Sequence, residues 1–289
     1  MKGILRMLAV AVGVLLIAVI ALLIVSFSGR QAITDGFELN GVRVIKDGMV
    51  SVGMLQVGTD AVALVDAGKD RSGKAILAEL TRRRLGVESV KAILLTHGHP
   101  DHIAAVPLFP NAEVMALEQE VGLVEGRAGS RGPLTRLMPA RPTGVKVGRV
   151  LRDGEPVNLG YKGFVVYPRR GPLDLEVRRM VYELVVHVYA VPGHTAGSAA
   201  FLVNGVLFLG DSADATSDGR IQGAAWTVTD DTAENRQSLV RLADRLREEG
   251  AAEKALGLDR ETEVKVLVFS HSGVLTRGLE PLTVFARRR

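Results

Sequence analysis

Three histidines and an aspartate are packed into six residues directly after an apolar run, and this pattern constrains the fold more than any other feature. The run KAILLT is followed at once by HGHPDH at residues 97–102. Three further polar residues follow other apolar runs: His194 after VVHVYAV, Asp211 after VLFLG and His271 after VKVLVFS. Short apolar runs of this kind are typical of buried strands. Because ligands of layered α/β proteins bind at the carboxyl ends of strands, we predict one site where four strand ends meet.

The residue types at these positions indicate metal binding. Neutral imidazole and carboxylate are suitable ligands for zinc, and also for iron or manganese. Two metal ions about 3.5–4 Å apart can share a bridging carboxylate. Gly98 would let residues 97–102 turn sharply and direct successive side chains to two neighbouring ions. The sixth histidine, His187, alternates with Val185 and Tyr189 inside a strand, so we interpret it as a structural residue.

The order of predicted elements favours sheets covered by helices. Short β-branched runs at residues 31–66 predict strands, and apolar residues spaced at helical intervals predict an amphipathic helix at 72–85. A second helix is predicted from Asp231 to about Gly250, capped by Thr229 or Asp230. Further strands are predicted at residues 90–96, 180–191, 199–209 and 264–269. The buried stripe of the second helix would be Leu239, Leu242, Ala243 and Leu246.

The segment 117–180, which is rich in Gly, Pro and Arg, is the hardest to interpret. It contains a possible short helix near residues 117–124 and possible strands near 145–151 and 164–167. We expect it to cover one side of the site and to set specificity. The arginines that suggest an anionic substrate are Arg127, Arg131, Arg136 and Arg141, although a solvated loop explains them equally well.

Residues 8–27 form an uncharged apolar stretch, LAVAVGVLLIAVIALLIVSF, which is long enough for a membrane-spanning helix. Lys2 and Arg6 precede it, which predicts a cytoplasmic N-terminus and an exported remainder, periplasmic or extracellular. We therefore predict an anchor or signal sequence at residues 1–30 and a catalytic domain at 31–289. A cleaved signal remains the main alternative, because Ser26-Phe27-Ser28 is a passable cleavage site, although signal h-regions are shorter. A buried helix of a cytoplasmic protein is a further alternative.

The composition of the chain excludes several kinds of site and partner. The chain has no cysteine, which excludes disulfides, thiolate metal ligands and a lipid-modified cysteine. Its formal charge is +4, but Lys2, Arg6 and Arg30 flank the apolar stretch and leave +1 for residues 31–289. Nucleic-acid binding would need a more basic face, so none is expected. We expect a small-molecule substrate, and the oligomeric state stays open.

With these motifs in view, the chain resembles the metallo-β-lactamase fold superfamily. The matching segments are HGHPDH at 97–102, Pro192-Gly193-His194-Thr195, Gly210-Asp211 and Ser270-His271, together with Val65-Asp66-Ala67-Gly68. The resemblance covers about residues 40–275. It implies an α/β fold of four layers, an αβ/βα sandwich in which two mixed sheets pack face to face between outer helices, here after an N-terminal transmembrane helix.

The resemblance also implies the role of each site residue. His97, His99 and His194 would hold one zinc ion, while Asp101, His102 and His271 would hold a second, with Asp211 bridging them. Asp66 and Thr195 would support the ligands from behind, and Asp66 could also be a simple turn residue. A hydroxide bound by the two metals would attack an ester, thioester, lactone or amide carbonyl. Asp101 could pass a proton to the leaving group.

The branch within the superfamily is harder to predict. The aspartate at the bridging position favours the relatives of glyoxalase II and the lactonases over the penicillin-degrading enzymes. Only about 18 residues follow His271, which argues against glutathione thioesters as substrates. For a lactonase, a tyrosine at 161, 167, 182 or 189 would be a candidate to contact the carbonyl. The alternatives are a mononuclear-iron enzyme resembling persulfide dioxygenases, and a non-catalytic, membrane-anchored metal-binding protein; a nuclease is less favoured. A flavodiiron relative would need a glutamate at His99.

Overall fold

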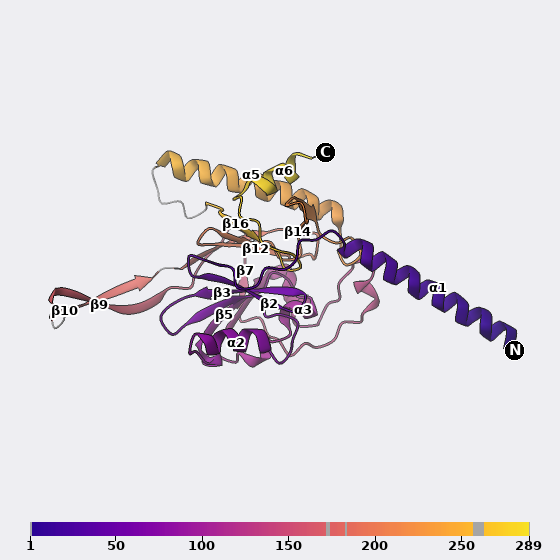
Figure 1. Cartoon of the computed structure of the whole chain (residues 1–289), viewed down its shortest axis with the longest axis horizontal. Coiled ribbons are helices and arrows are strands. Elements are labelled where there is room, and N and C mark those ends of the chain that lie inside the picture. The colour runs from indigo at the N-terminus through magenta and orange to yellow at the C-terminus, as the bar shows by residue number, and fades with distance from the viewer. Residues whose placement is uncertain (1, 172–173, 183, 257–262, 289) are drawn as a thin grey trace.

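The computed structural model describes residues 2–171, 174–182, 184–256 and 263–288, with backbone only for 2, 5, 23 and 161–182. Two sheets form the centre of the molecule (Figure 1). The first is mixed and has seven strands in the order β1-β2-β3-β4-β5-β6-β7. Its strands are β1 (Glu38–Leu39), β2 (Val42–Asp47), β3 (Val50–Gln56), β4 (Val62–Val65), β5 (Val90–Leu94), β6 (Glu113–Leu117) and β7 (Arg149–Leu151).

The second sheet has five strands in the order β16-β13-β12-β11-β8, and only β13 and β16 are parallel neighbours. Its strands are β8 (Pro156–Asn158), β11 (Val185–Ala190), β12 (Ala199–Val203), β13 (Val206–Phe208) and β16 (Val266–Val268). A small antiparallel pair, β14 (Ala213–Ala215) and β15 (Ile221–Gly223), follows β13. Both sheets are mixed, as predicted.

Three buried clusters mark the contacts between four layers. Between the sheets, Val44 and Leu94 of the first sheet pack in one cluster with Phe201 and Phe208 of the second. The outer face of the first sheet is covered by helix α2 (Lys74–Arg82), whose Ile76 and Leu80 are buried against it. The outer face of the second sheet is covered by α5 (Thr232–Leu256) and α6 (Glu280–Arg287). The predicted αβ/βα sandwich is therefore confirmed.

The remaining short helices connect the strands. They are α3 (Pro100–Ile103), α4 (Val121–Val124) and the single 3₁₀ turns η1 (Val87–Ser89), η2 (Val106–Leu108), η3 (Glu118–Glu120) and η4 (Thr135–Leu137). Strands β6, β8, β14 and β15 and helix α6 were not predicted. In the sequence, β6 is a short apolar run after Pro110-Asn111 that continues directly into the η3 turn, so its length and composition do not separate it from a helical segment.

The predicted stripe of α5 is confirmed, since Leu239, Leu242, Ala243 and Leu246 are all buried. The predicted cap is wrong. Asp231 Oδ1 accepts hydrogen bonds from the backbone N–H groups of Ala233 and Glu234, both at 2.9 Å, which is the usual role of a capping aspartate. Thr229 and Asp230 instead bond to the loops that surround the site.

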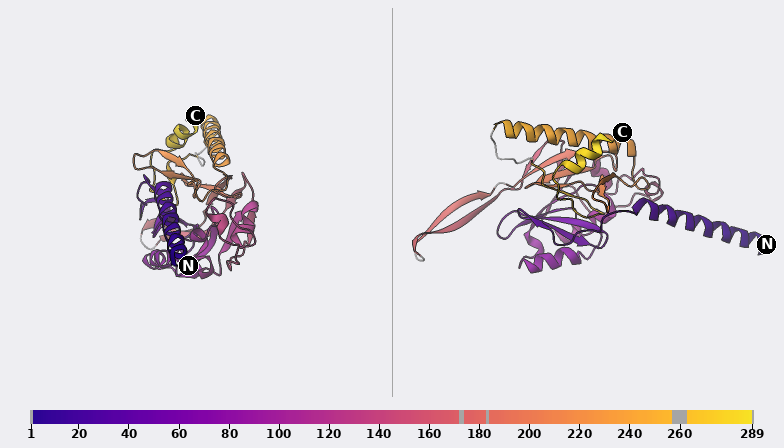
Figure 2. Two further views of the ribbon diagram at one scale, coloured as in Figure 1. Left: turned by 90° about the vertical axis from the view of Figure 1, so that its right-hand side faces the viewer. Right: turned by 45° about the horizontal axis from the view of Figure 1, so that its top comes forward.

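Residues 117–180 divide into parts that lie at opposite ends of the molecule. The backbone of 161–182 forms a hairpin of β9 (Tyr161–Gly171) and β10 (Asp174–Tyr182), which projects from one end of the body (Figures 1 and 2). Helix α1 (Lys2–Phe27) leaves the body at the other end. The expectation that this whole segment covers the site is therefore wrong for the hairpin.

Candidate metal centre

The carboxyl ends of four strands bring all seven predicted ligands together. Residues 97–102 follow β5, His194 follows β11, Asp211 follows β13 and His271 follows β16. The chain approaches itself so closely here that two glycines are required. A Cβ at Gly193, where φ is +129°, would lie 2.1 Å from the Asn235 nitrogen. Gly98 is needed for the same reason, since its Cβ would lie 2.7 Å from the Val124 nitrogen, although its backbone is not in the left-handed region.

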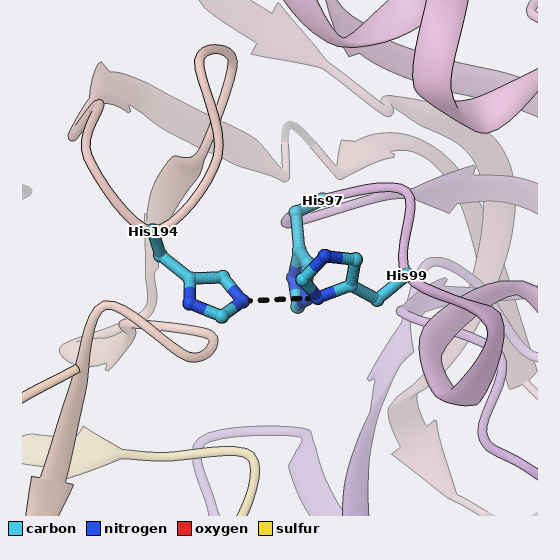
Figure 3. A group of neighbouring side chains, drawn as sticks. All are labelled: His97, His99 and His194. Atoms are coloured by element: carbon cyan, nitrogen blue, oxygen red, sulfur yellow. Dashed lines mark hydrogen bonds between the residues drawn. The ribbon is translucent and has the colours of Figure 1, made fainter. Parts of the chain in front are cut away.

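His97, His99 and His194 form a first group, called here the histidine triad. His99 Nδ1 lies 3.1 Å from His97 Nε2 and also 3.1 Å from His194 Nε2 (Figure 3). All three rings are buried, with exposures of 1%, 7% and 1%. Three ring nitrogens therefore converge on one small volume, an arrangement suited to one metal ion.

Asp101, His102 and His271 form a second group, called here the acidic triad. Asp101 Oδ2 lies 3.5 Å from His271 Nε2, and Asp101 Oδ1 lies 3.9 Å from His102 Nε2. The two imidazoles are buried, whereas the Asp101 side chain keeps 33% of its surface exposed. This group also has the composition of a metal site, and its aspartate faces solvent.

Asp211 lies between the two triads. Its Oδ2 is 3.1 Å from His271 Nε2 and 3.7 Å from His194 Nε2, while its Oδ1 is 3.3 Å from His102 Nε2. One carboxylate thus contacts ring nitrogens from both groups, which is the position that a bridging ligand requires.

Hydrogen bonds behind the rings determine which nitrogen of each histidine faces the centre. In the acidic triad, His102 Nδ1 lies 2.9 Å from Asp66 Oδ2, and His271 Nδ1 donates to the Met49 carbonyl at 2.7 Å. In the histidine triad, the Nδ1 atoms of His97 and His194 each lie 3.1 Å from a threonine hydroxyl, of Thr96 and Thr229 respectively. Such outer partners fix the ring orientation of metal ligands. Asp66, which the resemblance places behind a ligand, thus contacts the His102 ring.

The two triads differ in their protonation. Burial, reinforced by the neighbouring histidines, lowers the pKa of His97 well below its usual range and lowers the pKa of His194 to about 3. Burial also opposes the charged form of His102, but Asp211 and Asp66 outweigh it and raise the pKa of His102 well above its usual value. Asp211 and Asp101 likewise raise the pKa of His271 against the effect of burial.

The donor atoms that face the centre fit a metal. Within the described residues, the buried atoms His102 Nε2 and Asp211 Oδ1, which face the centre, have no partner with hydrogen-bond geometry. Buried polar atoms normally have partners, and an ion is a standard explanation for those that do not. An N/O donor set of imidazole and carboxylate suits a divalent cation such as zinc.

Glu120 was missed by the sequence analysis and links the two loops of the histidine triad. Its Oε1 accepts a hydrogen bond from the Gly98 N–H at 2.7 Å, and its Oε2 accepts one from the Gly197 N–H at 2.9 Å. Oε2 also accepts from the Thr195 hydroxyl at 2.9 Å. Glu120 is only 1% exposed, and burial raises its pKa. The only signal in the sequence is an acidic residue soon after an apolar run, which does not distinguish it from a surface glutamate.

Thr195, which the resemblance places behind the ligands, donates its hydroxyl to Glu120, and this hydroxyl also lies 2.8 Å from Ser198 Oγ. Tyr189 does not reach the site, since it is buried and donates to Glu249 Oε2 of α5 at 2.7 Å. The other candidate tyrosines, Tyr161, Tyr167 and Tyr182, belong to the hairpin and their side chains lie outside the described residues. His187 is in β11 and, among the described residues, is not part of a metal-binding group.

A cavity of about 830 Å³ opens beside the two triads. The residues that line it include His99 and Asp101 of the two triads, together with Leu123, Met138 and Pro139. Its basic residues are Lys69, Arg71 and Arg141. Of the four arginines predicted to suggest an anionic substrate, Arg141 therefore lines the cavity. Arg127 and Arg131 pair instead with Glu125 and Asp230.

Comparisons with known proteins agree with this geometry. The chain matches the family profile of the metallo-beta-lactamase superfamily over residues 45–252. A subclass B3 metallo-beta-lactamase of Bradyrhizobium japonicum is 19% identical, with a TM-score of 0.54 over 90% of this chain and 92% of that one. An archaeal metallo-beta-lactamase superfamily protein from Sulfolobus tokodaii is 19% identical, with a TM-score of 0.53 over 86% of each chain.

A third similar structure, a metallo-beta-lactamase family protein from Thermus thermophilus, is 25% identical, with a TM-score of 0.51 over 86% of this chain and 77% of that one. The comparison with curated proteins found no match. The structural similarities support the fold, and the profile match covers more than half of the sequence. The chain therefore belongs to the metallo-beta-lactamase superfamily.

Proposed function

We propose that this protein is a hydrolase that uses two zinc ions, one held by the histidine triad and one by the acidic triad, to cleave an ester, thioester, lactone or amide. The observation that carries the proposal is the position of Asp211, whose two oxygens contact ring nitrogens of both triads. A carboxylate in that position can hold two ions at the short separation that two-metal hydrolysis uses. When bound, the ions would polarise the substrate carbonyl and lower the pKa of a water molecule.

The side chains of this protein would prepare and complete that chemistry. The three neutral imidazoles of the histidine triad can bind a cation without first losing a proton, because burial keeps their pKa values low. Asp66 and the Met49 carbonyl hold the rings of His102 and His271 with Nε2 toward the centre. Glu120 keeps the His97 and His194 loops at a fixed separation.

Asp101 is the best placed group for moving a proton to the leaving group. It lines the cavity, it is partly exposed, and its carboxylate contacts His271. A carboxylate at the boundary between a metal centre and a substrate cavity can take a proton from water and pass it to the departing oxygen, nitrogen or sulfur. Lys69, Arg71 and Arg141 would favour a substrate that carries a negative charge.

We also propose that α1 anchors the protein in a membrane, with the catalytic domain on the exported side. Among the described residues, the segment Arg6–Phe27 is the one helix long and apolar enough to cross a bilayer. Its 22 residues extend about 33 Å at the usual helical rise, which matches the hydrocarbon thickness.

The test is metal analysis of the purified full chain together with a hydrolysis screen of thioesters, lactones and β-lactams. About two zinc ions per chain and turnover of one substrate class are expected for the native protein. Asp211→Ala should lose metal and turnover, while the matched control Asp218→Ala, an exposed carboxylate paired with Arg220, should retain both. One iron per chain with oxygen consumption on a persulfide would replace this proposal with a dioxygenase. Absence of bound metal would refute it.

A further inference from the structure

We propose that the substrate cavity faces the membrane that α1 crosses, and that the substrate is a membrane-resident amphiphile: an acyl ester or thioester with an anionic group. This inference rests on the proposed hydrolase function and on α1 as an anchor. It deepens them by naming a substrate class and its route of entry.

The first support is the rigid attachment of α1 to the site. The Arg30 guanidinium forms an ion pair with Asp214 at 2.7 Å, and both side chains are more than nine-tenths buried. The backbone of residues 29–31 also bonds to the β14 region: the Gln31 N–H donates to the Ala215 carbonyl and the Ser217 N–H to the Gly29 carbonyl, both at 2.8 Å. A flexible tether would make none of these contacts. The end of α1 therefore has a fixed position relative to the metal centre.

The second support is the short distance from the end of α1 to the acidic triad. The Phe27 ring lies edge-on to the His271 ring, with 6.4 Å between the centroids. The Arg30 guanidinium also packs on this aromatic ring, 4.2 Å from the Phe27 centroid. Phe27 is the last residue of the apolar span. The point at which the chain would leave the hydrocarbon core therefore lies beside His271, a proposed metal ligand.

The third support is the direction in which the body extends. Helix α1 and the β9–β10 hairpin leave the body at opposite ends of its long axis (Figures 1 and 2). The pink segment between α4 and β7, which supplies a wall of the cavity, lies at the end from which α1 leaves. A bilayer crossed by α1 would therefore lie against the cavity end of the body and far from the hairpin.

The fourth support is an apolar rim at that end, formed by Leu137, Met138 and Trp226. Their exposed fractions are 74%, 55% and 47%, which is unusual for large apolar side chains of a soluble face. Met138 also lines the cavity. Trp226 belongs to the neighbouring loop, which is joined to the same segment by the hydrogen bond from the Leu134 N–H to the Thr227 carbonyl at 2.9 Å. Exposed tryptophan and aliphatic side chains of this kind are typical of surfaces that bind at the membrane interface.

The cavity itself matches an amphiphile. Its wall contains Ile103, Pro107 and Leu123, which suit an acyl chain. Lys69, Arg71 and Arg141 supply positive charge for an anionic group. Hydrolysis would form a bond between the acyl carbon and the oxygen of water and would break the ester or thioester bond. The products are a fatty acid and an alcohol or thiol, and no other reactant is needed.

Trp226 is the only tryptophan of the chain, so its fluorescence tests the placement without any turnover. The full chain would be reconstituted in phosphatidylcholine vesicles, with and without dibrominated acyl chains. We expect brominated lipid to reduce Trp226 emission about twofold, because the indole should reside at the interface. The matched control is Trp226→Phe combined with Val87→Trp. Val87 is exposed in η1 at the opposite, amino-terminal end of β5, and its indole should not be quenched. Equal emission of Trp226 in both kinds of vesicle would overturn the proposal.

The substrate class is tested in the same vesicles with two esters of 4-methylumbelliferone, the laurate and the water-soluble acetate. We expect Leu137→Glu to lower the ratio of laurate to acetate hydrolysis about tenfold, which corresponds to losing the burial of one leucine in lipid. An unchanged ratio would overturn the substrate class. If the metal-loaded protein cleaves neither ester while Trp226 is quenched, the acyl-ester substrate class fails and the placement at the membrane stands, and the metal analysis and substrate screen described above decide the hydrolase function separately. If the acetate is cleaved but Trp226 is not quenched, the hydrolase function stands and the placement at the membrane fails.

Discussion

The histidine triad and the acidic triad lie side by side but are built from different physical environments. The histidine triad is made of three buried imidazoles with lowered pKa values, held by threonine hydroxyls and by Glu120. The acidic triad includes a partly exposed aspartate, and its imidazoles have raised pKa values because carboxylates surround them. The difference teaches that the lowered pKa values favour cation binding in the histidine triad, whereas the raised pKa values in the acidic triad make protons compete more strongly with a cation.

The largest expected effect comes from removing one ligand of each triad separately. His194→Ala and His271→Ala should each lose about one zinc ion per chain, and turnover should fall by more than about a hundredfold, since even residues behind metal ligands cost 10–100-fold. Metal analysis and a turnover assay measure both quantities. Retention of two ions by both variants would contradict the division of the centre into two triads.

Removing a side chain that contacts the outer nitrogen of a ligand histidine should weaken metal binding at that histidine's triad only, and by less than removing the histidine itself. Asp66→Asn should weaken binding at the acidic triad by about 10–100-fold, because Asp66 Oδ2 orients His102 through a hydrogen bond of 2.9 Å. Thr229→Val removes a neutral hydroxyl at 3.1 Å from His194 Nδ1 and should weaken the histidine triad less, at the lower end of the same range. Competition with a zinc chelator measures both affinities. Equal losses of zinc affinity in the two variants would contradict the expected difference between the carboxylate of Asp66 and the hydroxyl of Thr229.

Glu120→Gln should act on the histidine triad alone. The amide places an N–H₂ group where a carboxylate oxygen now accepts hydrogen bonds from backbone N–H groups, which should cost about 1–3 kcal/mol of unfolding free energy. Denaturant unfolding of the metal-free protein measures this loss. The matched control is Glu118→Gln, an exposed residue of the same 3₁₀ turn, which should change the stability little. If the two variants are equally stable, Glu120 does not join the two loops.

Without any substitution, the two triads should differ in the pH dependence of their metal affinity. The pKa values of His102 and His271 are raised, so in the metal-free protein these rings keep their protons to a higher pH than the rings of the histidine triad do. Zinc must displace them, and affinity at the acidic triad should fall as the pH falls, by about tenfold per pH unit for each proton released. The histidine triad is already neutral and should change less. Titration calorimetry in two buffers of different ionisation enthalpy counts the protons, and equal release at both sites would contradict the assignment.

Most of the strands and the two long helices were predictable because they depend on local patterns. The stripe of α5 and the apolar run of α1 repeat at short intervals that any window of the sequence reveals. The capping residue of α5 was predicted wrongly, because Thr229, Asp230 and Asp231 are all good caps and the choice depends on which of them other loops engage. Asp230 accepts bonds from Ser130 and Arg131, residues about a hundred positions away.

The sequence by itself determined which residues could bind metal and that each follows a strand, because side-chain chemistry and apolar runs are properties of short segments. Only the tertiary structure decided that Asp211 lies between the two triads, that Glu120 is buried between two loops and that Phe27 lies against His271. These contacts join residues far apart in the chain, and their geometry follows from the packing of whole sheets. Local composition carries no record of that packing, since many sequences with the same patterns would place the same side chains elsewhere.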